Sequence, residues 1–566
     1  MQIDRVWRFP SSDSTLSTES FLQITDWIRH CKEEHEPCNQ NIFEDSNVKA
    51  LPTRLLRLGT LDQPLLRLID GKDLPVDAVY FTLSHCWGSA VLTKLTEAVL
   101  DSYRVSIDIT QLSKTFQDAI HVARSLGAYA IWIDALCIIQ DSAEDWSREA
   151  PLMYGVYHGA ELNIAATASV DGSGGLGRQR DPSHLGGCLV RTTWANIPSL
   201  QNKGRQCVLL IRPKGHTWYE CVSQARLMDR GWVYQELSLA KRVVHFADQQ
   251  LFWECNLFRA SESQPRGRCP HGHGYDGGGD HNRRKESLWG RYSTALSARS
   301  DRQSHWRGIV GHYNQCRLTY ATDKLPALSG LAECMARLCG WEMTDYLAGI
   351  WREGLPEALL WRAVRNSNLT HSSTYCAPSW SWASTDTVFT YRSDFPKQKV
   401  LMSIVEACTE PKDHPLGPIT NAWVKIEAPC CVIDLLVESD SSYLMNGVTK
   451  LDVALSLDRF GIGHLKCVFA AVQYYTDNPS PSWFNPPNTD PKYPRYTYAS
   501  GNIIGLVLQP TGRTRGEYRR VGVLEVDESK HASAVAYFED VFKNSKLESD
   551  EYEQECRWRK YLITIV

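Results

Sequence analysis

Three short segments of the chain carry side chains that could act as nucleophiles or transfer protons. The first is Ser84-His85-Cys86, in which a hydroxyl, an imidazole and a thiol are adjacent. Such groups are well placed for chemistry where a strand of a sheet ends. Adjacent strand residues point to opposite faces, so the three cannot all serve one site, and a structural role is the favoured interpretation. Trp87 would then fill space, and Gly88 would allow a sharp turn.

The second segment begins at Asp134, which follows an apolar run. A buried carboxylate is costly unless it is paired or hydrogen-bonded, so Asp134 requires a partner. It is expected either to cap the next backbone turn or to serve as an acid, a base or an acceptor for a sugar hydroxyl. Cys137 is a candidate nucleophile, although no neighbouring base in the sequence would lower the pKa of its thiol. Gln140 is a candidate ligand contact.

The third segment contains Arg230, Trp232, Gln235 and Glu236. The last three have helical spacing (i, i+3, i+4) and therefore share one face. Such a cluster could hold a polar ligand or close a domain interface, and an Arg230–Glu236 salt bridge is the simpler interpretation. Should the site act on a glycosidic bond, Glu236 is the first candidate for the carboxylate that stabilises an oxocarbenium-like transition state, with Asp134 second.

A fourth group, Cys31, His35 and Cys38, has the spacing i, i+4 and i+7. These side chains lie on one helix face if the helix continues to Pro37. With a fourth ligand from elsewhere they could hold zinc, but a packed helix face is the favoured interpretation. The Gly- and His-rich stretch 261–285 is expected to be a mobile insert.

Most of these candidate residues lie in a part of the chain where short apolar runs alternate with amphipathic segments. Strands are predicted at 80–84, 128–134 and 162–168, with helices at 113–126 and 145–158 between them. The β-α-β-α-β order predicts an α/β fold with a parallel sheet. Because the carboxyl ends of parallel strands meet at one edge, the polar segments that follow them should converge on a crevice there.

The chain of 566 residues is too long for a single core. Residues 1–75 are expected to form a helical lead-in, and 76–255 the α/β domain with a hairpin over 243–255. Residues 256–385 are expected to comprise the insert and a helical extension. Alternating short strands over 386–566 predict a β-rich C-terminal domain.

The composition narrows the class of protein. A hydrophobic fraction of 43% and a charged fraction of 22% are typical of soluble globular chains. The 61 Lys and Arg residues nearly balance the 65 Asp and Glu residues, which gives a net charge of −4. Nucleic acid is therefore not an expected partner. Neither a signal peptide nor a membrane span is apparent, which predicts a cytoplasmic protein with reduced cysteines.

Several of these segments together resemble the successive blocks of the fungal heterokaryon-incompatibility (HET) domain. The blocks are Leu83-Ser-His-Cys-Trp-Gly88, Trp132-Ile-Asp-Ala-Leu-Cys-Ile-Ile-Gln-Asp141, Met153 with Tyr157, and Arg230-Gly-Trp232 with Gln235-Glu236. The segments 323–332 and 377–383, and Trp27 with Cys31, His35 and Cys38, are also similar to the flanks of full-length HET-domain proteins. His85 stands where a tyrosine is common in the family. The resemblance covers roughly residues 20–385.

The resemblance implies a filamentous-fungal protein that triggers programmed cell death when genetically unlike hyphae fuse. It also implies a distant relationship to TIR domains, and hence a flavodoxin/TIR-like parallel sheet. Some TIR domains cleave NAD with a glutamate, and others only assemble as adaptors. NAD as a substrate and homotypic association of the HET domain are therefore both expectations, and the resemblance assigns neither activity to a residue here.

Two other functions are compatible with the same residues. One is a secondary-metabolite biosynthetic enzyme (a lyase, cyclase or hydrolase) with a small-molecule ligand in the same crevice, since reactive side chains and 19 tryptophans are available. The other is a non-catalytic interaction scaffold. The catalytic candidates are Glu236, Asp134, Cys137, His85 and Cys86, and the candidate ligand contacts are Ser84, Trp87, Gln140, Arg230, Trp232 and Gln235.

Overall fold

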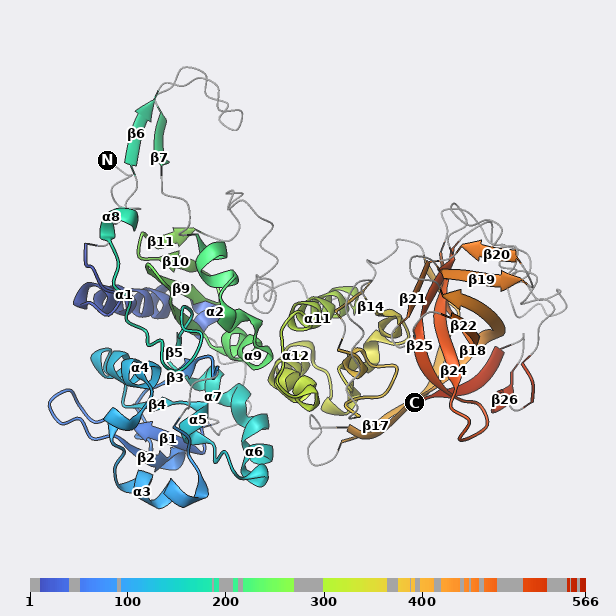
Figure 1. The fold of residues 1–566 in the computed structure, drawn as a ribbon, viewed down its shortest axis with the longest axis horizontal. Coiled ribbons are helices and arrows are strands. Elements are labelled where there is room, and N and C mark those ends of the chain that lie inside the picture. The colour runs from blue at the N-terminus through green and yellow to red at the C-terminus, as the bar shows by residue number, and fades with distance from the viewer. Residues whose placement is uncertain are drawn as a thin grey trace. The chain divides into compact units, whose positions relative to one another are not determined.

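The computed structural model of the chain separates into two compact units (Figure 1). The first comprises Met1–Leu318 and Ala327–Cys339, and the second comprises Thr319–Pro326 and Gly340–Val566. The structure describes residues 11–39, 51–88, 93–185, 188–192, 207–211, 217–268, 299–363, 375–386, 388–391, 398–411, 419–437, 442–446, 449–452, 454–457, 463–475, 502–526, 547–549, 551–556 and 560–566.

A nine-stranded mixed sheet forms the centre of the first unit, in the order β11-β10-β9-β8-β5-β3-β4-β1-β2. Its four parallel strands are β3 (Tyr80–Ser84), β4 (Ala130–Trp132), β5 (Leu162–Ala165) and β8 (Arg242–Phe246). Every residue of these four strands is buried, as expected for parallel strands covered on both faces. The antiparallel edges are β1 (Arg54–Arg57) with β2 (Arg67–Asp70), and β9 (Leu251–Cys255), β10 (Arg259–Ser261) and β11 (Gln264–Arg268).

The edges of this sheet correct three predictions. The sheet is mixed rather than parallel, because the antiparallel strands β1 and β2 extend it on one side and the antiparallel strands β9, β10 and β11 extend it on the other. Residues 1–75 are not a purely helical lead-in, since β1 and β2 lie within them and β1 is hydrogen-bonded on both sides, to β2 and β4. Residues 261–268 belong to the hairpin of β10 and β11 rather than to a mobile insert; the rest of the predicted insert lies outside the described residues.

Helices cover both faces of the parallel strands. The helix α4 (Lys114–Ser125) connects β3 to β4, whereas α6 (Ala143–Glu149) and α7 (Met153–Gly159) connect β4 to β5. Because β4 and β5 flank β3, right-handed connections place α4 and α7 on opposite faces. Contacts agree with this arrangement: Phe116 of α4 packs against the ring of His85, and the Tyr80 hydroxyl donates to the carbonyl of Val156 in α7 at 2.8 Å.

Of the two helices predicted between the parallel strands, one is confirmed and the other is interrupted. The helix over 113–126 is confirmed as α4, and Gly127 after it adopts a left-handed φ of +79°. Ser113 occupies the N-cap position, but its hydroxyl accepts no hydrogen bond from the helix. The helix predicted over 145–158 is divided by a 3-10 turn at Ala150–Leu152, because Pro151 lacks the N–H that a continuous helix requires.

The N-terminal helix α1 (Thr18–Glu34) packs against β9 and is followed by the single turn α2 (Glu36–Asn39). Trp27 stacks on Trp253 with ring centroids 5.8 Å apart, and its Nε1 donates to the carbonyl of Pro265 at 2.8 Å. The first unit also contains α3 (Leu100–Val105), α5 (Asp134–Cys137), α8 (Pro182–Leu185), β6 (Cys188–Thr192), β7 (Cys207–Ile211), α9 (Gly231–Leu239), α11 (Arg299–Tyr313) and α12 (Ser329–Cys339). The hairpin predicted over 243–255 is confirmed as β8 and β9.

The second unit is β-rich, as predicted for the C-terminal region. Over its described residues the main sheet has 11 strands, and the long β18 (Ile419–Val437) pairs with β17, β19, β22 and β27. The other strands are β12 (Tyr346–Leu347), β13 (Ile350–Trp351), β14 (Arg362–Ala363), β15 (Phe389–Thr390), β16 (Gln398–Val400), β17 (Ser403–Pro411), β19 (Ser442–Asn446), β20 (Thr449–Asp452), β21 (Ala454–Leu457), β22 (Gly463–Tyr475), β24 (Asn502–Pro510), β25 (Glu517–Val526), β26 (Gln554–Glu555) and β27 (Lys560–Ile565). The chain is therefore a mixed α/β protein with a separate β-rich sheet.

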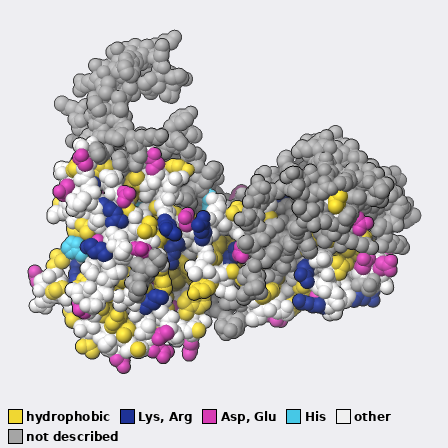
Figure 2. All heavy atoms as spheres, viewed as in Figure 1, with side chains coloured by type: hydrophobic (Ala, Val, Ile, Leu, Met, Phe, Trp, Pro, Cys, Tyr) yellow, Lys and Arg dark blue, Asp and Glu magenta, His cyan; other side chains and the backbone are white. Residues whose placement is uncertain are grey.

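Two surface properties bear on the expected partners. On the face of the first unit drawn in Figure 2, basic side chains are interspersed with acidic and hydrophobic ones. Within the described part of the chain, no helix is long and apolar enough to cross a membrane.

Candidate functional site

Ser84 and Glu236 meet at the carboxyl end of β3. Oγ of Ser84 donates to Oε2 of Glu236 at 2.6 Å and accepts from Nδ2 of Asn163 at 2.9 Å. Thr82 Oγ1 also donates to Oδ1 of Asn163, at 3.0 Å, so these hydrogen bonds join β3, β5 and α9. The direction of the chain crossovers reverses between β3 and β5, which is the place where open α/β sheets bind ligands.

The electrostatics of Glu236 suit it to proton transfer near neutral pH. Burial raises the pKa of this carboxyl to about 7, and the negative charge of Asp134 adds to the rise. The Arg230 guanidinium and the hydrogen bonds from Ser84 and Tyr157 favour the ionised form and limit the shift. Both protonation states of Glu236 are therefore populated near pH 7, a property typical of acid–base groups in active sites.

Arg230 and its neighbours are arranged differently from the prediction. No ion pair joins the described side chains of Arg230 and Glu236; instead, Nη1 of Arg230 donates to the carbonyl of His85. Gln235 Oε1 accepts from the backbone N–H of Gly330 at 2.7 Å, which ties α9 to α12. The ring of Trp232 lies edge-on to Trp146, at 6.2 Å between centroids. Of the residues predicted to share one ligand face, Glu236 is the one that contacts Ser84.

Asp134 is partly exposed rather than fully buried, and its carboxylate accepts two hydrogen bonds. Its Oδ2 accepts from Nε1 of Trp87 at 2.9 Å, and its Oδ1 accepts from the backbone N–H of Ala135 at 2.7 Å. Nδ1 of His85 lies 3.7 Å from Oδ1. The Asp134 side chain keeps 21% of its surface exposed, so solvent reaches this carboxylate.

His85 is buried and neutral at physiological pH. Burial lowers the pKa of its imidazole to about 4, because the opposing effect of the Asp134 carboxylate is smaller and the Arg230 charge lowers the pKa further. Nε2 of His85 is buried and has no hydrogen-bond partner among the described atoms. A neutral ring with an unpaired nitrogen can accept or donate one hydrogen bond.

A comparison with protein families identifies a domain within the first unit. Residues 80–236 match the model of the family described as heterokaryon incompatibility protein (HET). The chain contains a HET domain. The matched segment begins at the first residue of β3 and ends at Glu236, so the Ser84–Glu236 hydrogen bond joins its two ends. A HET domain implies a role in heterokaryon incompatibility, the nonself recognition of fungi. The search of curated proteins and that of solved structures gave no match.

Three further candidates of the HET domain lie in surroundings that favour a structural role. Cys86 packs in an apolar cluster with Val222 and Leu227, and burial raises the pKa of its thiol. Burial raises the pKa of Cys137 to about 12. Both thiols are therefore protonated at neutral pH, which disfavours nucleophilic attack. Nε2 of Gln140 donates to the carbonyls of Asp134 and Ile138, at 3.0 Å each, and holds the turn after α5.

Sequence reasoning missed two polar residues of the HET-domain site. Asn163 anchors Ser84, and the available signal was a lone amide inside the apolar run 162–168. Tyr157 was singled out in the helix stripe and in the family blocks but not as a site residue, although its hydroxyl lies 3.5 Å from the carbonyl oxygen of Leu83 and it lowers the pKa of Glu236.

The residues that could hold a metal lie away from this site in the sequence. Cys31, His35 and Cys38 come together with Cys255. Among the described residues, these four form a group with the composition of a metal site.

Proposed function

We propose that this protein is a HET-domain effector of fungal nonself recognition and programmed cell death, and that its HET domain hydrolyses NAD. The observation that carries the proposal is the buried carboxylate of Glu236, held by Ser84 at the end of β3 with a pKa of about 7. A carboxylate in this state can stabilise the positive charge that develops on a ribose ring.

The strand order supports the TIR-like part of the proposal. The parallel strands lie in the order β4-β3-β5-β8, which is second, first, third and fourth along the chain. Flavodoxin-like sheets have this order and bind their ligands between the first and third strands, here β3 and β5. Ser84 and Asn163 lie on those two strands.

The proposed reaction breaks the bond between C1′ of the ribose and the nicotinamide nitrogen, and the electron pair leaves with nicotinamide. Ionised Glu236 stabilises the oxocarbenium-like ribose, and a water oxygen then bonds to C1′. The water gives up one proton, for which partly exposed Asp134 is the base that we assign. The products are nicotinamide, ADP-ribose and one proton.

The test is nicotinamide release from NAD by the purified full chain, followed by chromatography. We expect Glu236→Gln to lower the rate by about 100-fold or more, since the amide cannot carry the charge. The matched control is Glu525→Gln, because Glu525 is a buried glutamate of the second unit. The wild-type rate should rise with pH through about 7 as Glu236 ionises.

Two outcomes would contradict this assignment. Release that is equal in wild type and Glu236→Gln would show that the carboxylate is not the catalytic group. No release by the wild type would overturn NAD hydrolysis, and homotypic association of the HET domain would then become the proposed mechanism. Its test is a light-scattering mass that increases with protein concentration. Expression of the wild type and Glu236→Gln in a filamentous fungus would show whether cell death depends on the same carboxylate.

A further inference from the structure

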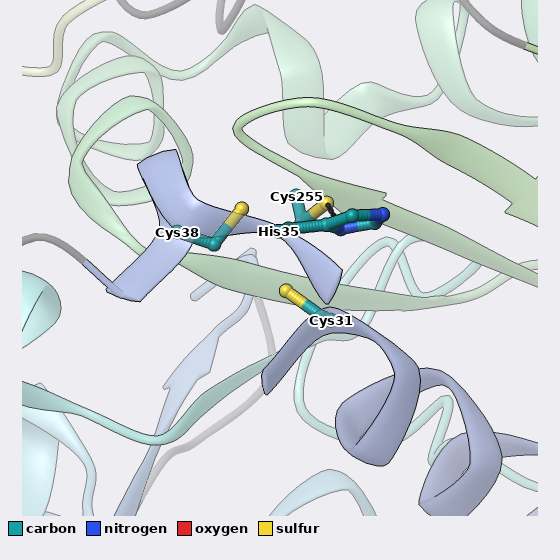
Figure 3. A group of neighbouring side chains, drawn as sticks. All are labelled: Cys31, His35, Cys38 and Cys255. Carbon is teal, nitrogen blue, oxygen red and sulfur yellow. Dashed lines mark hydrogen bonds between the residues drawn. The ribbon is translucent and has the colours of Figure 1, made fainter. Parts of the chain in front are cut away.

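We propose that Cys31, His35, Cys38 and Cys255 form a structural zinc site. Figure 3 shows the three cysteine side chains and the imidazole gathered around one point, contributed by the end of α1, by α2 and by β9. The three Sγ atoms and one ring nitrogen all lie within 4.8 Å of one another. Three cysteines and one histidine are a common ligand set of structural zinc.

The spacing of these atoms is close to what zinc requires. Tetrahedral zinc with bonds of about 2.0 to 2.3 Å separates its ligand atoms by roughly 3.4 to 3.8 Å. Nδ1 of His35 and Sγ of Cys255 are already 3.4 Å apart. The most widely separated atoms need to approach by only about 1 Å, which side-chain rotation can supply.

The local fold explains how three ligands from one short segment surround a point. The helix α1 does not continue to Pro37 but ends at Glu34, and His35 leaves the helical conformation with φ −108° and ψ 85°. The N–H of His35 still donates to the carbonyl of Cys31 at 3.2 Å, and that of Cys38 to the carbonyl of His35 at 3.0 Å. The chain therefore curls around the ligand atoms instead of presenting them along one straight helix face.

The fourth ligand comes from β9, beyond the C-terminal end of the matched HET segment. Cys255 is the last residue of β9, and its N–H donates to the carbonyl of Phe258 at 2.9 Å. It is 220 positions from His35 in the sequence, so spacing within the lead-in could not identify it. All four side chains are buried, and His35 is the most exposed at 7%.

The surroundings suit a negatively charged metal centre. Three thiolates, one neutral imidazole and Zn²⁺ together carry a charge of −1. Nε of Arg242 donates to Sγ of Cys31 at 3.3 Å and supplies a compensating positive charge. Nη2 of the same arginine donates to Oδ1 of Asn39 at 2.9 Å, which holds α2 beside β8. A hydrogen-bonded outer shell of this kind orients metal ligands in proteins.

This inference is independent of the proposed activity, because the ligands lie outside the matched segment 80–236. The competing interpretations are three buried reduced thiols and a disulfide between two of them. Both predict a chain without metal, so metal content separates them from the zinc site.

The first experiment measures zinc by mass spectrometry in the full chain, purified without chelators. We expect about one zinc per chain, released by a thiol-binding mercurial. Cys255→Ser and Cys38→Ser should each lose most of this zinc. Cys334→Ser is the matched control, because Cys334 is a fully buried thiol of the same unit outside the cluster, and it should retain the metal. Wild-type protein without stoichiometric zinc, or Cys255→Ser with as much zinc as wild type, would overturn the proposal.

A second experiment remains informative if the serine variants fail to fold. Cobalt(II) chloride in place of zinc should give the visible bands of tetrahedral cobalt and the near-ultraviolet bands of cobalt–thiolate charge transfer. Cys255→His keeps a ligand at this position but reduces the thiolates from three to two. We expect the charge-transfer absorbance per bound cobalt to fall by about one third. An unchanged absorbance would overturn the assignment of Cys255 as a ligand.

Discussion

The hydroxyl of Ser84 donates to the carboxylate of Glu236 at 2.6 Å, although the two residues are 152 positions apart. Ser84 ends the strand with which the matched HET segment begins, and Glu236 is the last residue of that segment. The bond therefore joins the two ends of the family segment inside the core. The protonation state of Glu236 should therefore affect the stability of the HET domain.

Glu236 should make the first unit less stable as the pH rises. An ordinary glutamate ionises near 4.5, so between pH 4.5 and about 7 the folded protein holds a proton that the unfolded chain has lost. The free energy of unfolding should fall through this window, by up to about 3 kcal/mol above pH 7. Glu236→Gln cannot ionise and should remove this decrease. Urea unfolding of both proteins at pH 5 and pH 8 is the measurement, and parallel pH dependences would contradict the prediction.

His85 should have the opposite effect on the acid side. Its imidazole has a pKa of about 4 in the folded protein and 6.5 ordinarily, so below pH 6.5 the unfolded chain binds a proton that the folded protein does not. Stability should therefore be lost as the pH falls from 6.5 to 4, by up to about 3 kcal/mol. His85→Phe, which can still pack against Phe116, should shift the midpoint of acid unfolding to lower pH. The control is His121→Phe, at an exposed position, and an equal shift there would refute the assignment.

The buried pair Arg180–Glu262 should be sensitive to the loss of either charge. Both side chains are almost completely buried, and Glu262 also accepts from the Ser20 hydroxyl at 2.7 Å and the Leu251 N–H at 2.8 Å. Glu262→Gln leaves the Arg180 charge uncompensated and should lower the free energy of unfolding of the first unit by about 3 to 5 kcal/mol. Replacing both residues with methionine should cost less than Glu262→Gln alone.

A matched control for that prediction is Glu33→Gln. Glu33 pairs with Arg29 at 3.2 Å on the surface of α1, where both side chains are more than half exposed. Exposed pairs of this type contribute little, so no measurable change in the urea midpoint is expected. If Glu33→Gln lowered the free energy of unfolding as much as Glu262→Gln, the destabilisation would come from removing any charge and not from the burial of the pair.

Two glycines with similar backbone angles should respond differently to alanine. Gly88 has φ +60°, and a Cβ there would lie 2.3 Å from Cβ of Asp171. Gly127 has φ +79°, but an added Cβ would meet nothing within 4 Å. Gly127→Ala should therefore cost about 1 kcal/mol of backbone strain, whereas Gly88→Ala should cost roughly 1 to 3 kcal/mol more. Thermal unfolding of both variants checks the difference, and equal losses would contradict it.

The accuracy of the sequence predictions depends on the range of the interactions involved. The strand β3 and the helix α4 are confirmed because apolar periodicity and flanking turn residues determine them locally. The strands β1 and β2 are missed because β1 pairs with β2 and with the distant β4, and such pairing leaves no local pattern in the sequence. For the same reason Glu236 could be singled out as a candidate, but its partner Ser84 and the anchoring Asn163 could not be assigned to it.

The association of α1 with β9 constrains the order in which the first unit can fold during translation. Trp27 stacks on Trp253, and the buried face of α1 also includes Ile24 and Cys31. During translation this helix leaves the ribosome long before residue 253 is synthesised. Until then its apolar face has no native partner, so we expect α1 to need a chaperone or a temporary contact within the nascent chain. Helix α1 would accordingly be among the last elements of its unit to reach the native position.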